Sequence, residues 1–137
     1  NDFNFVRQYN HHEFLVKLDE KFPGIKSKNF IKMAQYFYSA KIVNLLLQNY
    51  QKTRSIKYDI IIYGTSLDIE SNNLMIEEIG IRDNIMYTQN NYWFAKSQIM
   101  QTLFNIYDKM IYVSDMSFKD MVKQHLKHKN IKIIEVY

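Results

Sequence analysis

The strongest pattern in the sequence is a long helical repeat between Asn29 and Thr53. Its apolar residues recur at three- and four-residue steps, which places them along one side of a helix: Tyr36, Ala40, Val43, Leu47 and Tyr50. Ser27 stands where an N-cap residue is expected, and a shorter helix over residues 10–21 should precede it. An amphipathic helix of this length needs other elements against which its apolar stripe is buried.

Short β-branched and aromatic runs follow this helix and predict strands. Residues 56–63 (IKYDIIIY) form the clearest run, and residues 74–81 and 84–89 predict two further strands of an antiparallel meander. A helix through residues 71–80 is the alternative for this part, because its two glutamates favour helices.

The last third of the chain alternates between the two kinds of pattern. It predicts a helix over residues 92–107, a strand over 109–114, a helix from Ser117 and a final strand over 131–137. Because the last two strands enclose a single helix, we expect a βαβ unit with parallel strands and a right-handed crossover.

Together these elements predict an α/β fold in the order α-α-β-β-β-α-β-α-β, with a mixed sheet flanked by helices. The length of 137 residues suits a single domain over 1–137. We expect 56–63, 109–114 and 131–136 to be largely buried in the sheet, because these runs are continuously apolar. The absence of cysteine excludes disulfide scaffolds and thiolate zinc sites, and no apolar run nears the ~20 residues of a membrane helix.

The net charge of +4 is unevenly distributed along the chain. Residues 1–57 hold 10 basic and 4 acidic residues, residues 58–95 hold 1 and 6, and residues 96–137 hold 7 and 4. An acidic centre between basic flanks fits a metal-dependent enzyme acting on phosphates, because carboxylates bind a hard cation and lysines attract a polyanion. The alternatives are a solvated acidic hairpin and the lysine-rich composition of an AT-rich bacterial or phage genome.

The order of helix, three-stranded meander, helix and strand over residues 29–114 resembles the core of the restriction-endonuclease-like (PD-D/E-x-K) superfamily. In that family an Asp on one central strand and a Glu/Asp-x-Lys motif on the next bind Mg²⁺ beside the scissile phosphate. Asp59 lies in the first predicted strand, and Glu77 or Glu78 follows 18 or 19 residues later. The resemblance makes Asp59 and Glu77 the candidate ligands of Mg²⁺ or Mn²⁺, with Glu78 as a further candidate catalytic carboxylate.

The chain departs from the family at the motif lysine. Ile79 or Gly80 occupies that position, and neither side chain can donate or withdraw a proton. Lys57 is the first candidate replacement, because it precedes Asp59 by two residues and would share its strand face. Lys96, on the predicted following helix, is the second.

A second set of candidate residues lies on the last predicted helix. Lys119, Lys123 and Lys127 recur at four-residue steps, and Lys129 follows them. Four cations on one side would track a phosphate backbone, whereas the plainer interpretation is a solvated helix face. The four histidines do not have the spacing of a zinc site.

Two classes of function fit these features. The first is a basic α/β domain that acts on or binds nucleic acid. A metal-dependent nuclease domain is the most specific version of this hypothesis. The second is a non-catalytic protein-binding domain of the immunity, antitoxin or phage counter-defence type, which the missing cofactor motif and incomplete catalytic set favour. We expect a nucleic-acid or protein partner, no membrane, no organic cofactor and a cytoplasmic location, because cysteines and a signal segment are absent.

Overall fold

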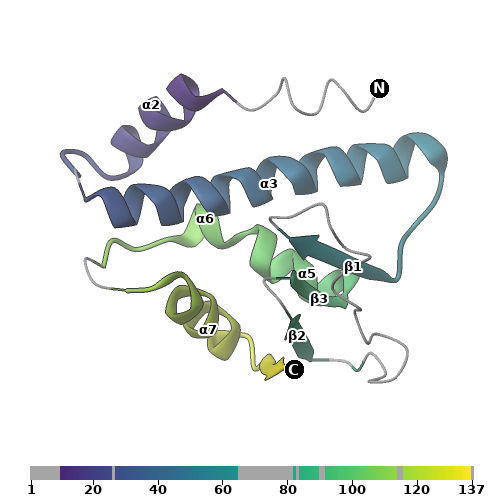
Figure 1. Cartoon of the computed structure of the whole chain (residues 1–137). Helices are drawn as coiled ribbons and strands as arrows, with labels where there is room; N and C mark the ends of the chain where they lie inside the picture. Colours follow the sequence, from purple (N-terminus) through teal and green to yellow (C-terminus); the bar gives the residue numbers. More distant parts are fainter. Residues whose placement is uncertain are drawn as a thin grey trace. The chain divides into compact units, whose positions relative to one another are not determined.

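The computed structural model describes residues 10–25, 27–64, 82, 84–89, 92–113 and 116–136. These residues form an α/β fold, as predicted, with helices and a four-stranded mixed sheet (Figure 1). The described helices are α2 (His11–Lys21), α3 (Lys28–Arg54), α5 (Ser97–Phe104), α6 (Ile106–Lys109) and α7 (Phe118–His128). The described strands are β1 (Ile60–Gly64), β2 (Ile85–Gln89), β3 (Tyr92–Lys96) and β4 (Lys132–Glu135).

The chain folds into two compact units, each assembled from two separate stretches of sequence. The first unit comprises Asn1–Ile56 and Phe104–Met121, and the second comprises Lys57–Leu103 and Val122–Tyr137. The described secondary-structure elements of the first unit are helices, and the second unit holds β1, β2, β3 and β4. Each unit therefore depends on contacts between residues that are far apart in the sequence.

Helix α3 follows the predicted long helix within one residue at each end. Ser27 caps its start, because the Ser27 Oγ accepts a hydrogen bond from the Phe30 N–H at 3.4 Å. Ser55 ends it in the left-handed conformation, at φ 54°. The buried side differs from the predicted stripe, since Tyr50 is exposed and the buried residues of the first half are Phe30, Met33, Ala34, Phe37, Tyr38 and Ala40.

Aromatic contacts explain why this side of α3 is buried within the first unit. The Phe37 ring stacks on Phe118 of α7 with centroids 4.9 Å apart. Tyr38 meets Tyr107 of α6 edge-on at 5.1 Å, and it also packs against Phe14 of α2 at 5.3 Å. Such aromatic pairs contribute beyond the area that they bury, so the partners from α2, α6 and α7 select the face of α3 that becomes core.

The sheet has the strand order β1-β3-β2-β4. Strand β3 is antiparallel to both β1 and β2, whereas β4 runs parallel to β2. The central strands β2 and β3 are the buried ones, and the rings of Tyr87 and Phe94 stack at 5.5 Å where these two residues pair. The expectation that 56–63 and 131–136 are largely buried is wrong, because residues 56–60 are exposed and β1 and β4 form the edges.

Strand β3 corrects the helix predicted over residues 92–107. The first four residues of β3 are all buried, which fits a central strand covered on both faces and does not fit an amphipathic helix. The helix begins only at Ser97. Apolar residues of the strand happen to continue the helical repeat of α5, so the sequence pattern merges two elements into one.

The strand predicted over residues 109–114 is also corrected. Lys109 ends α6, and residues 110–113 have no regular secondary structure. Strand β4 instead finds its parallel partner in β2, with Tyr87 opposite Ile134, so the predicted C-terminal βαβ unit does not form. The strand predicted over 74–81 lies outside the described residues.

Candidate functional site

The metal site implied by the family resemblance falls only partly within the described residues. Asp59 is exposed and lies directly before β1 rather than inside the strand. Lys57 is also exposed and outside the strand, so the two-residue strand repeat does not place it on one face with Asp59. Glu77 and Glu78 lie outside the described residues.

The ladder between β1 and β3 places Ser97 opposite Asp59 and Lys96 opposite the next residue, Ile60. The Ser97 N–H donates to the Asp59 carbonyl oxygen at 2.8 Å, and Ile60 pairs with Lys96. Lys96 is thus the last residue of β3 and not a helical residue. Over the described ranges, no group of three or more His, Asp or Glu residues could hold a metal ion, and the second ligand predicted for Asp59, Glu77 or Glu78, lies outside these ranges.

All four predicted lysines are exposed: Lys119, Lys123 and Lys127 lie on α7, and Lys129 lies in the turn that follows it. The start of α7 is fixed by Ser117, whose Oγ accepts a hydrogen bond from the Asp120 N–H at 3.2 Å. Its other side is buried through apolar residues: Met121, Val122 and Leu126. The helix therefore separates a solvent-facing basic side from a buried apolar side, as its sequence pattern predicts.

Lys132 of β4 is exposed as well and adds a further cation to this part of the second unit. We refer to Lys123, Lys127, Lys129 and Lys132 as the C-terminal lysines. A tight turn connects the helix to the strand, with the Ile131 N–H donating to the Leu126 carbonyl oxygen at 3.0 Å. Within the part of the chain that the structure describes, none of the C-terminal lysines is ion-paired with a carboxylate.

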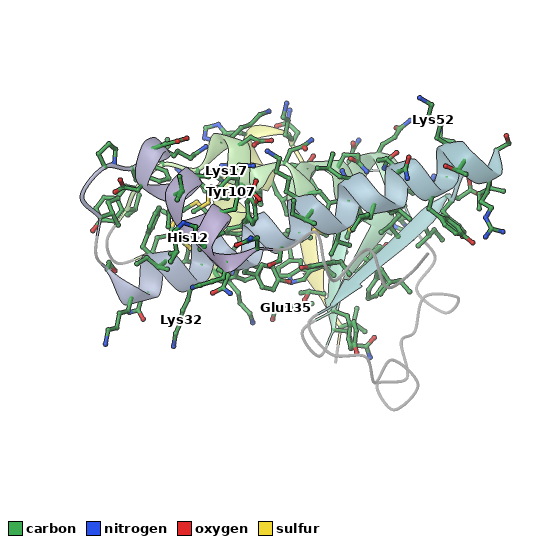
Figure 2. The ribbon with its side chains drawn as sticks, turned by 90° about the horizontal axis from the view of Figure 1, so that it is seen from above. His12, Lys17, Lys32, Lys52, Tyr107 and Glu135 are labelled. Carbon is green, nitrogen blue, oxygen red and sulfur yellow. The ribbon has the colours of Figure 1, made fainter. Side chains whose placement is uncertain are left out.

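A second concentration of charge lies in the first unit, where α2, α3 and α6 meet. We refer to its members as the lysine–tyrosine cluster: Lys17 and Lys21 of α2, Tyr38 and Lys41 of α3, and Tyr107 of α6. Figure 2 labels Lys17 and Tyr107 beside α2, whereas Lys32 and Lys52 project outward from α3. The Lys21 and Lys41 ammonium nitrogens lie 5.3 and 5.7 Å from the centre of the Tyr107 ring.

Asp108 holds two of these lysines. Lys21 Nζ donates to the Asp108 carbonyl oxygen at 2.8 Å, and Lys41 Nζ donates to the Asp108 Oδ1 at 2.7 Å. The third lysine, Lys17, is paired with Glu13 at 2.9 Å. Two of the three ammonium groups are thus paired with carboxylates, and the third, that of Lys21, is bonded to a backbone carbonyl.

The cluster perturbs the titration of its own members. Burial lowers the pKa of Lys21, and the neighbouring Lys41 charge lowers it further, while Asp108 acts in the opposite direction. Burial also raises the pKa of Tyr107, which keeps its hydroxyl protonated. The hydrogen bond to Glu13 is the main cause of the raised pKa of Lys17. Tyr107 is therefore a neutral donor whose ring lies near the ammonium groups of Lys21 and Lys41.

The sequence analysis missed the lysine–tyrosine cluster. Tyr107 there belongs to the apolar face of a predicted helix, and the three lysines are dispersed among the basic residues of the first 57 positions. Only the spacing of Lys17 and Lys21, four residues apart on one helix, carries a local signal. The contact with α6 joins positions more than 60 residues apart in the chain, which periodicity does not report.

We compared the chain with protein families, curated proteins and solved structures. No family model, no curated protein and no solved structure matches the chain. Among the described helices, none is both long and apolar enough to cross a membrane.

Proposed function

We propose that the protein binds nucleic acid through the C-terminal lysines. The observation that carries the proposal is the exposure, within ten residues of sequence, of four ammonium groups without a carboxylate partner in the described ranges. Lysines neutralise backbone phosphates and release their counterions, which supplies affinity without reading the bases. The proposed binding is therefore independent of sequence and sensitive to salt.

Stabilisation of the α7 helix dipole explains only one of the four C-terminal lysines. Lys127 lies in the last turn of α7, where a cation stabilises the negative end of the helix dipole. Lys123 lies one turn earlier, and Lys129 and Lys132 lie beyond the helix. The dipole effect falls off within the last turn, so it does not account for these three residues.

The test compares two double variants that remove the same charge from exposed helix positions four residues apart. Lys123→Ala/Lys127→Ala alters the C-terminal lysines, and Lys28→Ala/Lys32→Ala is the matched control on α3. Fluorescence anisotropy with short single- and double-stranded oligonucleotides measures the affinity. We expect the first variant to bind duplex about tenfold or more weakly at ~0.1 M salt, with a salt slope reduced by about 1.8, and the control to bind nearly as the wild type does.

Two other outcomes would count against the proposal. Equal losses in both double variants would mean that the overall charge of +4 attracts the oligonucleotide without a defined surface. An absence of binding in the folded wild-type protein would favour the protein-binding alternative. That alternative is supported by the exposed apolar residues after α6: Ile111, Tyr112 and Val113.

In its catalytic form the proposal adds a divalent cation at Asp59. Glu77 or Glu78 would supply the second carboxylate, and Mg²⁺ or Mn²⁺ would activate a water molecule beside the phosphate. The ladder pairs Lys96 with Ile60 and Ser97 with Asp59, so Lys96 and Asp59 are neighbours along the backbone that alternate in the face they occupy. Lys57 and Lys96 therefore both stay candidates for the ammonium group.

A further inference from the structure

The Tyr107 hydroxyl is a buried hydrogen-bonding group without a partner in the described part of the chain. Tyr107 is only 5% exposed, and its ring is held between Tyr38 and two lysines. Buried hydroxyl groups nearly always have a hydrogen-bond partner, because leaving one unsatisfied costs its full desolvation. The unsatisfied Tyr107 hydroxyl is therefore a candidate hydrogen-bond donor to a bound ligand.

The surroundings of this hydroxyl restrict what it can bind. The cluster holds three ammonium groups and two carboxylates: Lys17 pairs with Glu13 and Lys41 with Asp108, whereas Lys21 bonds only the Asp108 backbone carbonyl. A cation would be repelled by this arrangement, and a neutral ligand would gain little from it. An anion gains from every ammonium group, and it can accept the hydrogen bond that Tyr107 does not make.

The number of free protons favours an anion with several oxygen atoms. Each ammonium group has three protons, and Lys21 and Lys41 each use one of them in the bonds to Asp108. Both groups also reach solvent, since the Lys41 side chain is one-third exposed and Lys21 is of intermediate exposure. A phosphoryl group offers three oxygens and nearly two negative charges at neutral pH, whereas a carboxylate offers two oxygens and one charge.

We propose that the lysine–tyrosine cluster binds a phosphoryl group. One phosphoryl oxygen accepts the hydrogen bond from the Tyr107 hydroxyl, and the others take the remaining protons of Lys21 and Lys41. The site is separate from the C-terminal lysines, because all its residues belong to the first unit. It therefore does not depend on the proposed nucleic-acid surface.

Inorganic phosphate is the first probe, added to the full chain at constant ionic strength with chloride as the reference salt. We expect phosphate to raise the melting temperature of the wild type, because a ligand that binds the folded state stabilises it by mass action. Tyr107→Phe removes the hydroxyl alone. We expect this variant to lose at least half of the shift while being no less stable than the wild type in chloride.

A lysine pair supplies an independent readout if Tyr107→Phe does not fold. Lys21→Gln removes one ammonium group of the cluster, and Lys28→Gln removes an exposed lysine at the start of α3. We expect the phosphate shift to fall in the first variant and to persist in the second. A wild type without any phosphate shift, or equal shifts in Lys21→Gln and Lys28→Gln, would overturn the proposal.

Two sources of the phosphoryl group are distinguished by a second probe. A short oligonucleotide with a 5′-phosphate is compared with the same oligonucleotide without it, in the Lys123→Ala/Lys127→Ala background. A preference for the phosphorylated end that Tyr107→Phe abolishes would assign the site to a nucleic-acid terminus. Equal binding of both oligonucleotides, with the inorganic phosphate shift retained, would assign it to a small phosphorylated molecule. Loss of all oligonucleotide binding in this background would support the C-terminal lysines as the nucleic-acid surface, and the inorganic phosphate shift would then test the lysine–tyrosine cluster by itself.

Discussion

Gly64 shows how a single residue limits the packing of the sheet. It pairs with Tyr92 across the ladder between β1 and β3. A Cβ atom added at Gly64 would overlap the Tyr92 ring, and Tyr92 is itself buried, so the ring has little space into which it can move. The absence of a side chain at this position is what allows the ring to lie over the strand.

We therefore expect Gly64→Ala to lower the free energy of unfolding by about 1–3 kcal/mol, the usual cost of overpacking a core. Chemical denaturation measures this loss. A double-mutant cycle identifies its cause, because Tyr92→Ala removes the ring that the new methyl group would meet. An equal cost of Gly64→Ala with and without the ring would show that the backbone, and not the clash, is responsible.

At the level of secondary structure, the segment that follows α6 differs most from what its sequence pattern predicts. Residues 110–113 (MIYV) are rich in strand-forming residues, yet they make no ladder. The backbone continues in an extended conformation at Met110, with φ −60° and ψ 141°. An extended apolar segment without a sheet partner leaves side chains in solvent, and Ile111 is 65% exposed.

Alanine substitutions at two isoleucines of the first unit, one buried and one exposed, test whether residues 110–113 are packed. Ile106 of α6 is 1% exposed, so Ile106→Ala should lower the free energy of unfolding by about 2–5 kcal/mol. Ile111→Ala should change it by about 0.5 kcal/mol or less, since surface substitutions rarely do more. Thermal or urea unfolding measures both. A loss for Ile111→Ala as large as that for Ile106→Ala would mean that 110–113 is packed as a strand after all.

At the scale of the whole molecule, the two proposed sites differ in how far apart their residues lie in the sequence. The four C-terminal lysines lie within ten consecutive positions, whereas a metal site at Asp59 needs Glu77 or Glu78 from a later part of the chain. Such carboxylates repel one another when they converge, unless a cation or a lysine compensates their charge. A cation that joins them would bind the folded protein and not the unfolded chain.

Mg²⁺ or Mn²⁺ should consequently raise the melting temperature of the wild-type protein. Asp59→Asn should abolish this shift together with any cleavage of nucleic acid, because the amide lacks the charge that the cation requires. Asp120→Asn, at another exposed aspartate, is the matched control and should keep the shift. Retention of the shift in Asp59→Asn would exclude Asp59 as a ligand.

The features of this protein that follow from the sequence without knowledge of the fold are mostly local. Helix α3, the start of α7 at Ser117 and the run that becomes β2 could all be predicted, because helical period, capping residues and β-branched runs act within a few residues. The exposed lysines of α7 were predicted for the same reason, since the alternation of basic and apolar residues along one helix already separates its two sides.

Contacts between residues distant in the sequence determine which apolar runs become strands and which residues come together in a site. Residues 92–96 and 110–113 have similar local patterns, yet only the first run finds neighbours on both sides, in β1 and β2. Lys41, Tyr107 and Asp108 come together for a comparable reason, because α6 packs against α3. Strand pairing and side-chain clustering are contacts between distant positions, and their free energies depend on the partner as much as on the residue itself.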